Sequence, residues 1–181
     1  MAVNYSEAGF VGRGSAGVAG AVTFRHKKLN GIAQIASSIK DDTDIQTLMN
    51  KGYNFAVMIN NEVRTYGSNQ TGSGEWIDGV LGRLWLKIRI REVLYPIIAD
   101  GDKLNYDTEG AGAIETGVRS VIAEGQNLNV VARDTRPSVR TPNVLELSPE
   151  QRNTRVLPNV VFDCRLTGAI EGVISRGEVY A

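Results

Sequence analysis

The sequence predicts an α+β fold in which a mixed β-sheet is flanked by two main helices. Three observations indicate this class. Both halves of the chain contain segments that alternate apolar and polar residues, as half-buried strands do. Two longer segments repeat apolar residues every three or four positions, as helices do. The predicted elements follow one another in the order β-α-β-β-α-α-β-β-β, which excludes a regular βαβ repeat.

The N-terminal segment, residues 1–20, is predicted to be a glycine-rich connection, and residues 21–181 to be one core domain. Gly12 to Gly17 match the G-x-G-x-x-G spacing of dinucleotide-binding loops. That site needs a full crossover helix after the glycines, and Thr23 comes only six positions after Gly17. The next strand, residues 21–27, has already begun there. The pattern is therefore interpreted as a connection and not as a cofactor site.

The next predicted elements are a short helix and a hairpin. Asp41, Asp42 and Asp44 precede an apolar helical pattern that Gly52 can terminate. The acidic run could bind a hard cation, but it lacks the glycine and the closing glutamate of a calcium loop, so a helix cap is favoured. Strands 53–60 and 62–66 follow, joined across Asn60–Asn61, a pair that tolerates tight hairpin turns.

Two long helices occupy the middle of the chain. The first begins near Glu75, and its apolar residues predict burial on much of its circumference: Ile77, Leu81, Leu84 and Ile88, flanked by Trp76, Val80 and Leu94. Pro96 or residues 100–102 are expected to end it. The second helix is predicted to be capped near Asp107 or Thr108 and to end at Gly125.

The C-terminal third is predicted to be mostly strands. Segments 129–133, 138–141 and 143–147 have strand patterns, with prolines at 137 and 142 marking edges or bends. Ser148 and Pro149 indicate the cap and first residue of a short helix. Residues 160–167 then alternate, with Cys164 on the apolar face as a structural thiol, and residues 171–180 continue beyond a bend at Gly168.

Composition excludes several classes of function. Twenty basic and 20 acidic residues give a formal net charge of zero, so no bulk field attracts nucleic acid or an anionic membrane. One cysteine and one histidine exclude an internal disulfide, a protein-built zinc site and a histidine-based catalytic triad. We expect no cofactor, no metal, no signal peptide and no direct membrane insertion. No spacing singles out a catalytic pair among the acidic residues.

One basic cluster lies on the first long helix, at Arg83, Lys87, Arg89 and Arg91. Trp85 and Leu86 interleave with these cations. The cluster fits the solvated side of an amphipathic helix. It also fits an electrostatic contact with an acidic protein surface, whereas RNA or DNA is disfavoured by the zero net charge.

From about Val22 to its end, the chain resembles the C-terminal portion of contractile tail sheath proteins from tailed, myovirus-like bacteriophages. The order and spacing of eight short motifs carry this resemblance: residues 28–32 (KLNGI), 51–55 (KGYNF), 76–78 (WID), 85–87 (WLK), 103–104 (KL), 106–110 (YDTEG), 152–158 (RxxRxxP) and 166–171 (LTGAIE). Such proteins usually have a long N-terminal half, and here Met1 comes just before the core. The chain is thus expected to be a fragment or an unusually short subunit.

The resemblance implies a structural, self-assembling subunit without an active site. Proteins of this kind form stacked hexameric rings around a tail tube and contract to drive the tube through the host envelope. The implied partners are further copies of the chain, the tube protein, and baseplate and tail terminator proteins. The implied location is the phage tail, after assembly in the host cytoplasm. The cluster Arg83, Lys87, Arg89 and Arg91 is then a candidate tube-facing surface.

Strands at the chain ends of neighbouring sheath subunits are added to the core sheet, so the resemblance also makes residues 171–180 a candidate donated strand. Its candidate residues are Glu171, Val173, Ile174, Val179 and Tyr180. An ordinary edge strand of the chain's own sheet is the equal alternative. Two further functions stay open: another tail component, such as a tube or baseplate protein, and a small soluble enzyme with a carboxylate-based site.

Overall fold

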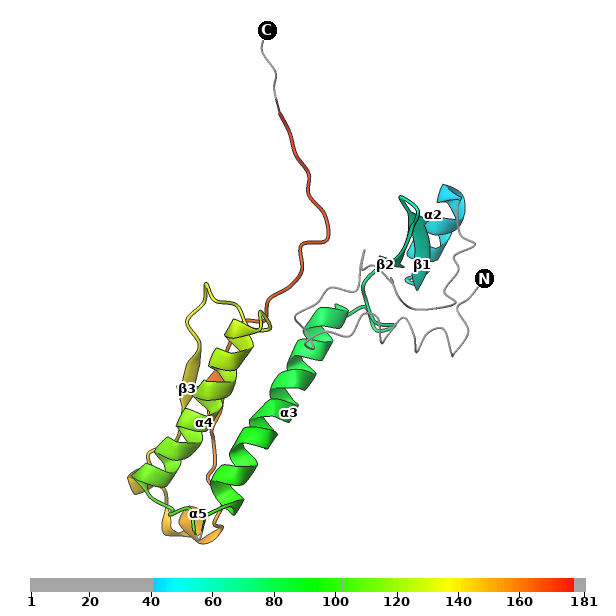
Figure 1. Cartoon of the computed structure of the whole chain (residues 1–181). Helices are drawn as coiled ribbons and strands as arrows, with labels where there is room; N and C mark the ends of the chain where they lie inside the picture. Colours follow the sequence, from blue (N-terminus) through cyan, green and yellow to red (C-terminus); the bar gives the residue numbers. More distant parts are fainter. Residues whose placement is uncertain (1–40, 102, 178–181) are drawn as a thin grey trace. The chain divides into compact units, whose positions relative to one another are not determined.

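The computed structural model describes residues 41–101 and 103–177, and it confirms the α+β class (Figure 1). The described residues divide into two compact units. One contains residues 41–78 and 168–177, and the other contains residues 79–101 and 103–167. The predicted strand 21–27 and the glycine pattern at 12–17 lie outside the described residues.

The first unit begins with helix α2, Asp42–Asn50, and the predicted cap is confirmed. The Asp41 side chain accepts a hydrogen bond from the Thr43 amide at 2.9 Å, so the acidic run serves the helix terminus. Gly52 follows the helix with a φ of 73°, the left-handed conformation expected of a glycine after a helix.

A hairpin completes the core of this unit. Strands β1, Asn54–Ile59, and β2, Glu62–Gly67, pair antiparallel with Ile59 opposite Glu62. Asn60 and Asn61 have φ values of 51° and 60°, the positive values that a two-residue type I′ turn requires. Their identity therefore predicted the turn correctly. The buried side chains of β1 pack against the apolar side of α2: Phe55 and Val57 against Ile45, Leu48 and Met49.

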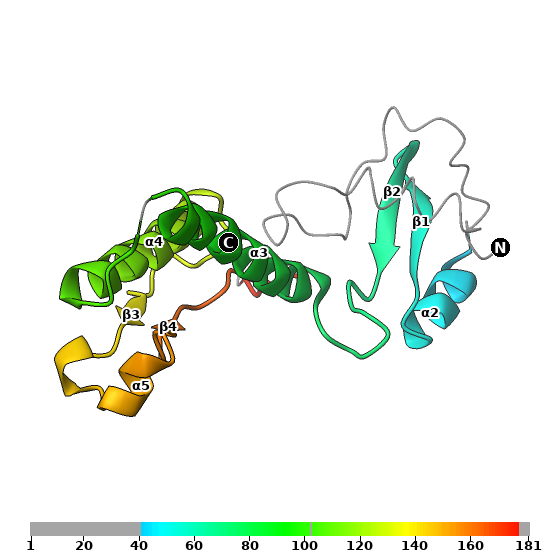
Figure 2. The ribbon, with the colours of Figure 1, turned by 90° about the horizontal axis from the view of Figure 1, so that it is seen from below.

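The second unit is built on helices α3, Ile77–Ala99, and α4, Thr108–Asn127, which lie side by side in Figures 1 and 2. The α4 cap is Asp107, as predicted, and its side chain accepts from the Gly110 amide at 2.9 Å. Helix α3 continues through Pro96 and ends at Ala99. A proline this close to the helix end disrupts only the last turn, so the helix ends just before Asp100 and Gly101 and not at Pro96.

The prediction that the Leu81, Leu84 and Ile88 face of α3 is buried was wrong. These three side chains are 37%, 49% and 47% exposed, whereas Leu86 is 6% exposed and belongs to the core with Val118, Val121 and Ile122 of α4. Apolar residues surround α3, so their spacing alone does not select one face. Gly82 permits the close contact on the buried face. A Cβ added there would lie 3.4 Å from both Leu166 methyl groups.

The remaining strands of the second unit are short. Strand β3, Ser138–Arg140, pairs antiparallel with β4, Val161–Asp163, with Val139 opposite Phe162. Among the described residues, the strands thus form two separate antiparallel pairs, β1–β2 and β3–β4, in place of one larger sheet. The predicted strand 160–167 is reduced to β4 and an isolated bridge between Val131 and Leu166.

Two predicted strands are corrected by the structure. Residues 129–133 form no strand, because the amides of Val130 and Val131 both donate to the Gly125 carbonyl at 2.8 and 3.0 Å. Residues 143–147 contain a 3₁₀ helix, η1, Val144–Glu146, because the Asn143 side chain accepts from the Leu145 amide and caps it.

The short helix α5, Pro149–Asn153, is confirmed. Ser148 and Gln151 form a capping box: the Ser148 hydroxyl accepts from the Gln151 amide, and the Gln151 side chain accepts from the Ser148 amide.

Candidate functional site

The second unit has a groove of about 540 Å³ between one face of α3 and the segment formed by β4 and the residues after it. Its apolar lining comes from both sides: Leu86 and Ile90 of α3, with Phe162, Cys164 and Leu166. Three cations from α3 also line it, Arg83, Lys87 and Arg91, and Asp163 is the one carboxylate among its described lining residues. The groove therefore combines an apolar floor with a basic rim.

The three cations share one line along α3 because they are spaced four residues apart. All three side chains are exposed. Lys87 and Arg91 form no hydrogen bond or ion pair with any residue in the described part of the chain. Their charges are available to an anionic partner.

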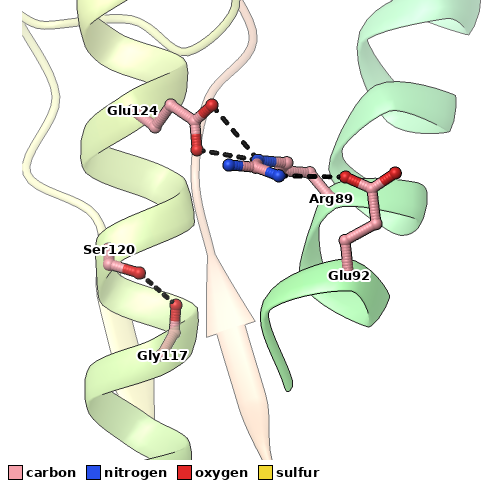
Figure 3. Close-up of polar contacts among 5 residues, drawn as sticks. All are labelled: Arg89, Glu92, Gly117, Ser120 and Glu124. Carbon is pink, nitrogen blue, oxygen red and sulfur yellow. Dashed lines mark hydrogen bonds and ion pairs between the residues drawn. The ribbon is translucent and has the colours of Figure 1, made fainter. Parts of the chain in front are cut away.

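Arg89, the fourth member of the predicted basic cluster, does not line the groove. Its Nε atom donates to both carboxylate oxygens of Glu124 on α4, at 2.9 and 3.2 Å, and Nη1 donates to Glu92 at 3.0 Å (Figure 3). The hydrogen bonds to Glu124 and Glu92 raise the pKa of Arg89. Figure 3 also shows Ser120 donating to the Gly117 carbonyl within α4. The structure thus separates Arg89 from Arg83, Lys87 and Arg91.

Side chains of α4 hold the sheet that carries β4. Arg119 donates from Nη2 to the Val139 carbonyl of β3 at 2.8 Å and to Glu115 at 2.7 Å. Glu115 also accepts from the Thr141 hydroxyl at 3.0 Å. These bonds to Arg119 and Thr141 lower the pKa of the Glu115 carboxyl. The contacts fix β3 against α4, and β3 in turn positions β4 beside the groove.

Cys164 lies in the apolar part of the groove and is half-buried. Burial raises the pKa of its thiol, and the negative charge of Asp163 raises it further. The thiol is therefore uncharged at neutral pH and acts as a small apolar surface, as the sequence predicted.

The described part of the candidate donated segment belongs to the first unit. Residues 171–177 form no strand there, and Ile170, Val173 and Ile174 are 86%, 84% and 92% exposed. Two hydrogen bonds hold the start of this segment. The Ala169 amide donates to Asp78 Oδ2 at 3.0 Å, and Asn69 Nδ2 donates to Glu171 Oε1 at 2.7 Å. Val179 and Tyr180 lie outside the described residues.

The described residues offer neither a metal-ligand cluster nor a candidate membrane span. Within residues 41–101 and 103–177, no three His, Cys, Asp or Glu side chains come together as metal ligands. No helix in that part of the chain is both long and apolar enough to span a bilayer.

Sequence analysis identified Arg83, Lys87 and Arg91 but missed the apolar residues that form the groove with them. Phe162 and Leu166 fall within the predicted strand 160–167, which no sequence signal connects to the basic cluster. The spacing of Arg83, Lys87 and Arg91 by four residues was the available signal. The residues across the groove from these cations are set by how residues 162–166 pack against α3. Local sequence patterns do not predict that packing.

No family model matches the sequence, and no curated protein matches it. Solved structures do match its fold. One is a cryo-EM structure of the anti-feeding prophage (AFP) baseplate, 6-fold symmetrised, with a TM-score of 0.63 and 14% identity over 96% of this chain and 49% of that chain. Another is the AFP helical sheath in its contracted state, with a TM-score of 0.61 and 12% identity over 96% of this chain and 48% of that chain.

The chain spans about half the length of the solved chains that it matches. At this low identity the likeness concerns the fold. The fold is of the phage-tail-like sheath type, and the two matched structures are structural parts of a contractile assembly and not enzymes. The predicted resemblance to contractile tail proteins is therefore supported at the level of fold.

Proposed function

We propose that the chain is a structural subunit of a contractile tail sheath. In this proposal it polymerises with further copies as stacked hexameric rings around a tail tube, and its contraction drives the tube through the host envelope. Baseplate and tail terminator proteins are its partners at the two ends. The assembly belongs to the tail of a phage or phage-like particle and forms in the cytoplasm of the bacterial host. The fold shared with the AFP sheath and baseplate structures supports the proposal.

One observation carries the self-assembly part of the proposal. The segment 168–177 presents Ile170, Val173 and Ile174 almost fully to solvent. Each exposed aliphatic side chain forgoes about 1.5–3 kcal/mol of burial free energy. An extended segment of this kind can be added to the edge of a sheet in a neighbouring subunit, where main-chain hydrogen bonds and side-chain burial both contribute. We propose that residues 171–180 act as this donated strand.

Electron microscopy of the full chain across protein concentration, paired with sedimentation, tests the proposal. Rings, tubes or stacked striations are expected. The variant Val173→Asp with Ile174→Asp should abolish them, because charged residues cannot be buried against a neighbour. Leu145→Asp, at an exposed position on η1, is the matched control and should leave assembly intact.

Two outcomes would contradict this proposal separately. Assembly unaffected by the double substitution would exclude the donated strand. A monomer at every concentration would exclude self-assembly by this chain.

The match to the AFP baseplate structure favours a baseplate component as the second candidate. Micrographs distinguish the two. A sheath subunit extends into tubes of many rings as concentration rises, whereas a baseplate component stops at a closed particle of fixed size.

We also propose that Arg83, Lys87 and Arg91 face an acidic surface of the tail tube. Arg89 has a smaller part in the proposed contact, because its guanidinium already binds Glu124 and Glu92. Co-sedimentation with a purified tube protein tests this. Lys87→Glu with Arg91→Glu should abolish binding, and unchanged binding would refute the proposed contact.

A further inference from the structure

We propose that the groove between α3 and β4 binds an extended, acidic segment of a partner protein, with carboxylates at every second position and apolar residues between them. This inference deepens the proposed contact with an acidic partner and rests on that part of the proposed function. The proposed contact with the tube is a general attraction between charged surfaces, whereas this inference specifies the sequence pattern of the bound segment.

The spacing of the cations carries the first step. Arg83, Lys87 and Arg91 follow one another at four-residue intervals on α3, which places them about 6 Å apart along the helix axis. Two residues of a β-strand cover about 6.6 Å. A strand lying along α3 therefore places every second side chain opposite one cation. Two carboxylates at alternate positions can be paired with Lys87 and Arg91 in the groove.

The lining of the groove carries the second step. Leu86, Ile90 and Leu166 supply an apolar floor between α3 and the segment after β4, and Phe162 and Cys164 extend it. In an extended segment the side chains between the carboxylates point the opposite way, so they can be apolar and enter this floor. A volume of about 540 Å³ is within the range of sites that hold several side chains.

The chemistry of the rim selects a protein over a nucleic acid. A nucleic acid strand is charged along its whole backbone and offers no aliphatic side chains to the floor. The zero net charge of the chain also provides no long-range attraction for a polyanion. An alternating acidic and apolar peptide matches both the rim and the floor.

The chain's own C-terminal segment lacks the required pattern. Between residues 168 and 181 the carboxylate side chains are those of Glu171 and Glu178, seven positions apart. An odd separation places two residues on opposite faces of a strand. We therefore assign the occupant to a segment other than residues 168–181.

Fluorescence anisotropy of the full chain with two labelled peptides tests the inference. The probe Val-Glu-Ile-Glu-Val-Glu-Ile alternates its carboxylates, and the isomer Glu-Glu-Glu-Val-Ile-Val-Ile has the same composition in blocks. The alternating peptide should bind about tenfold more tightly, because only its carboxylates match the cation spacing. Lys87→Glu and Arg91→Glu should each weaken its binding by about tenfold.

The matched control is Arg136→Glu, which makes the same charge change at an exposed position outside the groove. It should change affinity by less than about twofold. Lys87→Arg keeps the charge and should retain binding. Lys87→Gln provides a milder second variant, with a smaller loss of affinity expected. Circular dichroism verifies that each variant is folded.

Equal affinity for the two peptides, or equal loss in Arg136→Glu, would overturn the inference, because either result indicates charge attraction without a defined site. Tighter binding of a single-stranded oligonucleotide than of the alternating peptide would overturn it in favour of a nucleic acid. These measurements use the chain and a peptide alone. Failure of the tube contact would appear instead as selective peptide binding without co-sedimentation of the tube protein.

Discussion

Arg89 on α3 donates from Nε to both carboxylate oxygens of Glu124 on α4, at 2.9 and 3.2 Å, and so links the two long helices of the second unit (Figure 3). The same guanidinium holds Glu92 on its own helix. The link lies beside the apolar contact of Leu86 with Val118 and Val121. Arg83, Lys87 and Arg91 of the same helix line the groove instead.

The link between Arg89 and Glu124 should be measurable as an energetic coupling. We expect Arg89→Leu and Glu124→Gln each to destabilise the second unit, and the double variant to lose less than the sum of the two. High salt should reduce the coupling, because both groups are partly exposed. Chemical unfolding followed by Trp85 fluorescence in a Trp76→Phe background measures it. Strict additivity would show that the contact does not couple the helices.

The orientation of α3 predicts very different losses of stability for two leucines two positions apart. Leu86→Ala should cost about 2–5 kcal/mol, because it opens a cavity in the core of the second unit. Leu84→Ala should change stability by no more than about 0.5 kcal/mol, because this side chain is largely exposed. Unfolding midpoints of the two variants provide the comparison. A larger loss for Leu84→Ala would mean that the other face of α3 is buried.

Two glycines of α4 should respond oppositely to alanine. A Cβ at Gly110 would collide with the main-chain carbonyl of Asn105, which cannot move without distorting the turn before the helix. Gly110→Ala should therefore cost about 1–3 kcal/mol. At Gly112 no atom lies within 4 Å of an added Cβ, so Gly112→Ala should stabilise by up to about 1 kcal/mol through helix propensity. Circular dichroism during thermal unfolding measures both, and equal shifts would contradict the structure.

The contacts of Glu115 predict a pH-dependent contribution to stability. Hydrogen bonds from Arg119 and Thr141 lower the pKa of Glu115 in the folded chain. The contribution is therefore complete above the ordinary glutamate range and is lost as pH falls through the lower folded pKa. Glu115→Gln should cost about 1 kcal/mol at pH 7. The difference from the parent chain should shrink below about pH 4.

Asp100→Asn, at an exposed position after α3, is the control for this titration and should leave the stability profile unchanged. A cost of Glu115→Gln that stays constant down to acidic pH would show that the carboxylate charge contributes nothing to these bonds.

The features that were predicted correctly depend on neighbouring residues only. Asp41, Asp107 and Ser148 cap their helices because a side-chain oxygen two or three positions before an amide can reach it. Asn60 and Asn61 form the hairpin turn because asparagine tolerates positive φ. The incorrect predictions concern features that depend on contacts with other elements of the fold. Residues 129–133 have a strand pattern, yet the amides of Val130 and Val131 donate to the Gly125 carbonyl of α4.

By itself the sequence determined the α+β class, the helix caps, the hairpin turn and the presence of a basic row on a long apolar helix. Tertiary structure alone decided which face of α3 is buried. It also decided that Arg89 binds Glu124 and does not line the groove. Finally, it placed the other three cations beside an apolar groove next to β4. The physical reason is the range of the interactions. Capping and turn preferences act within about four residues. Burial depends on segments such as 162–166, which pack against α3 from a distant part of the chain.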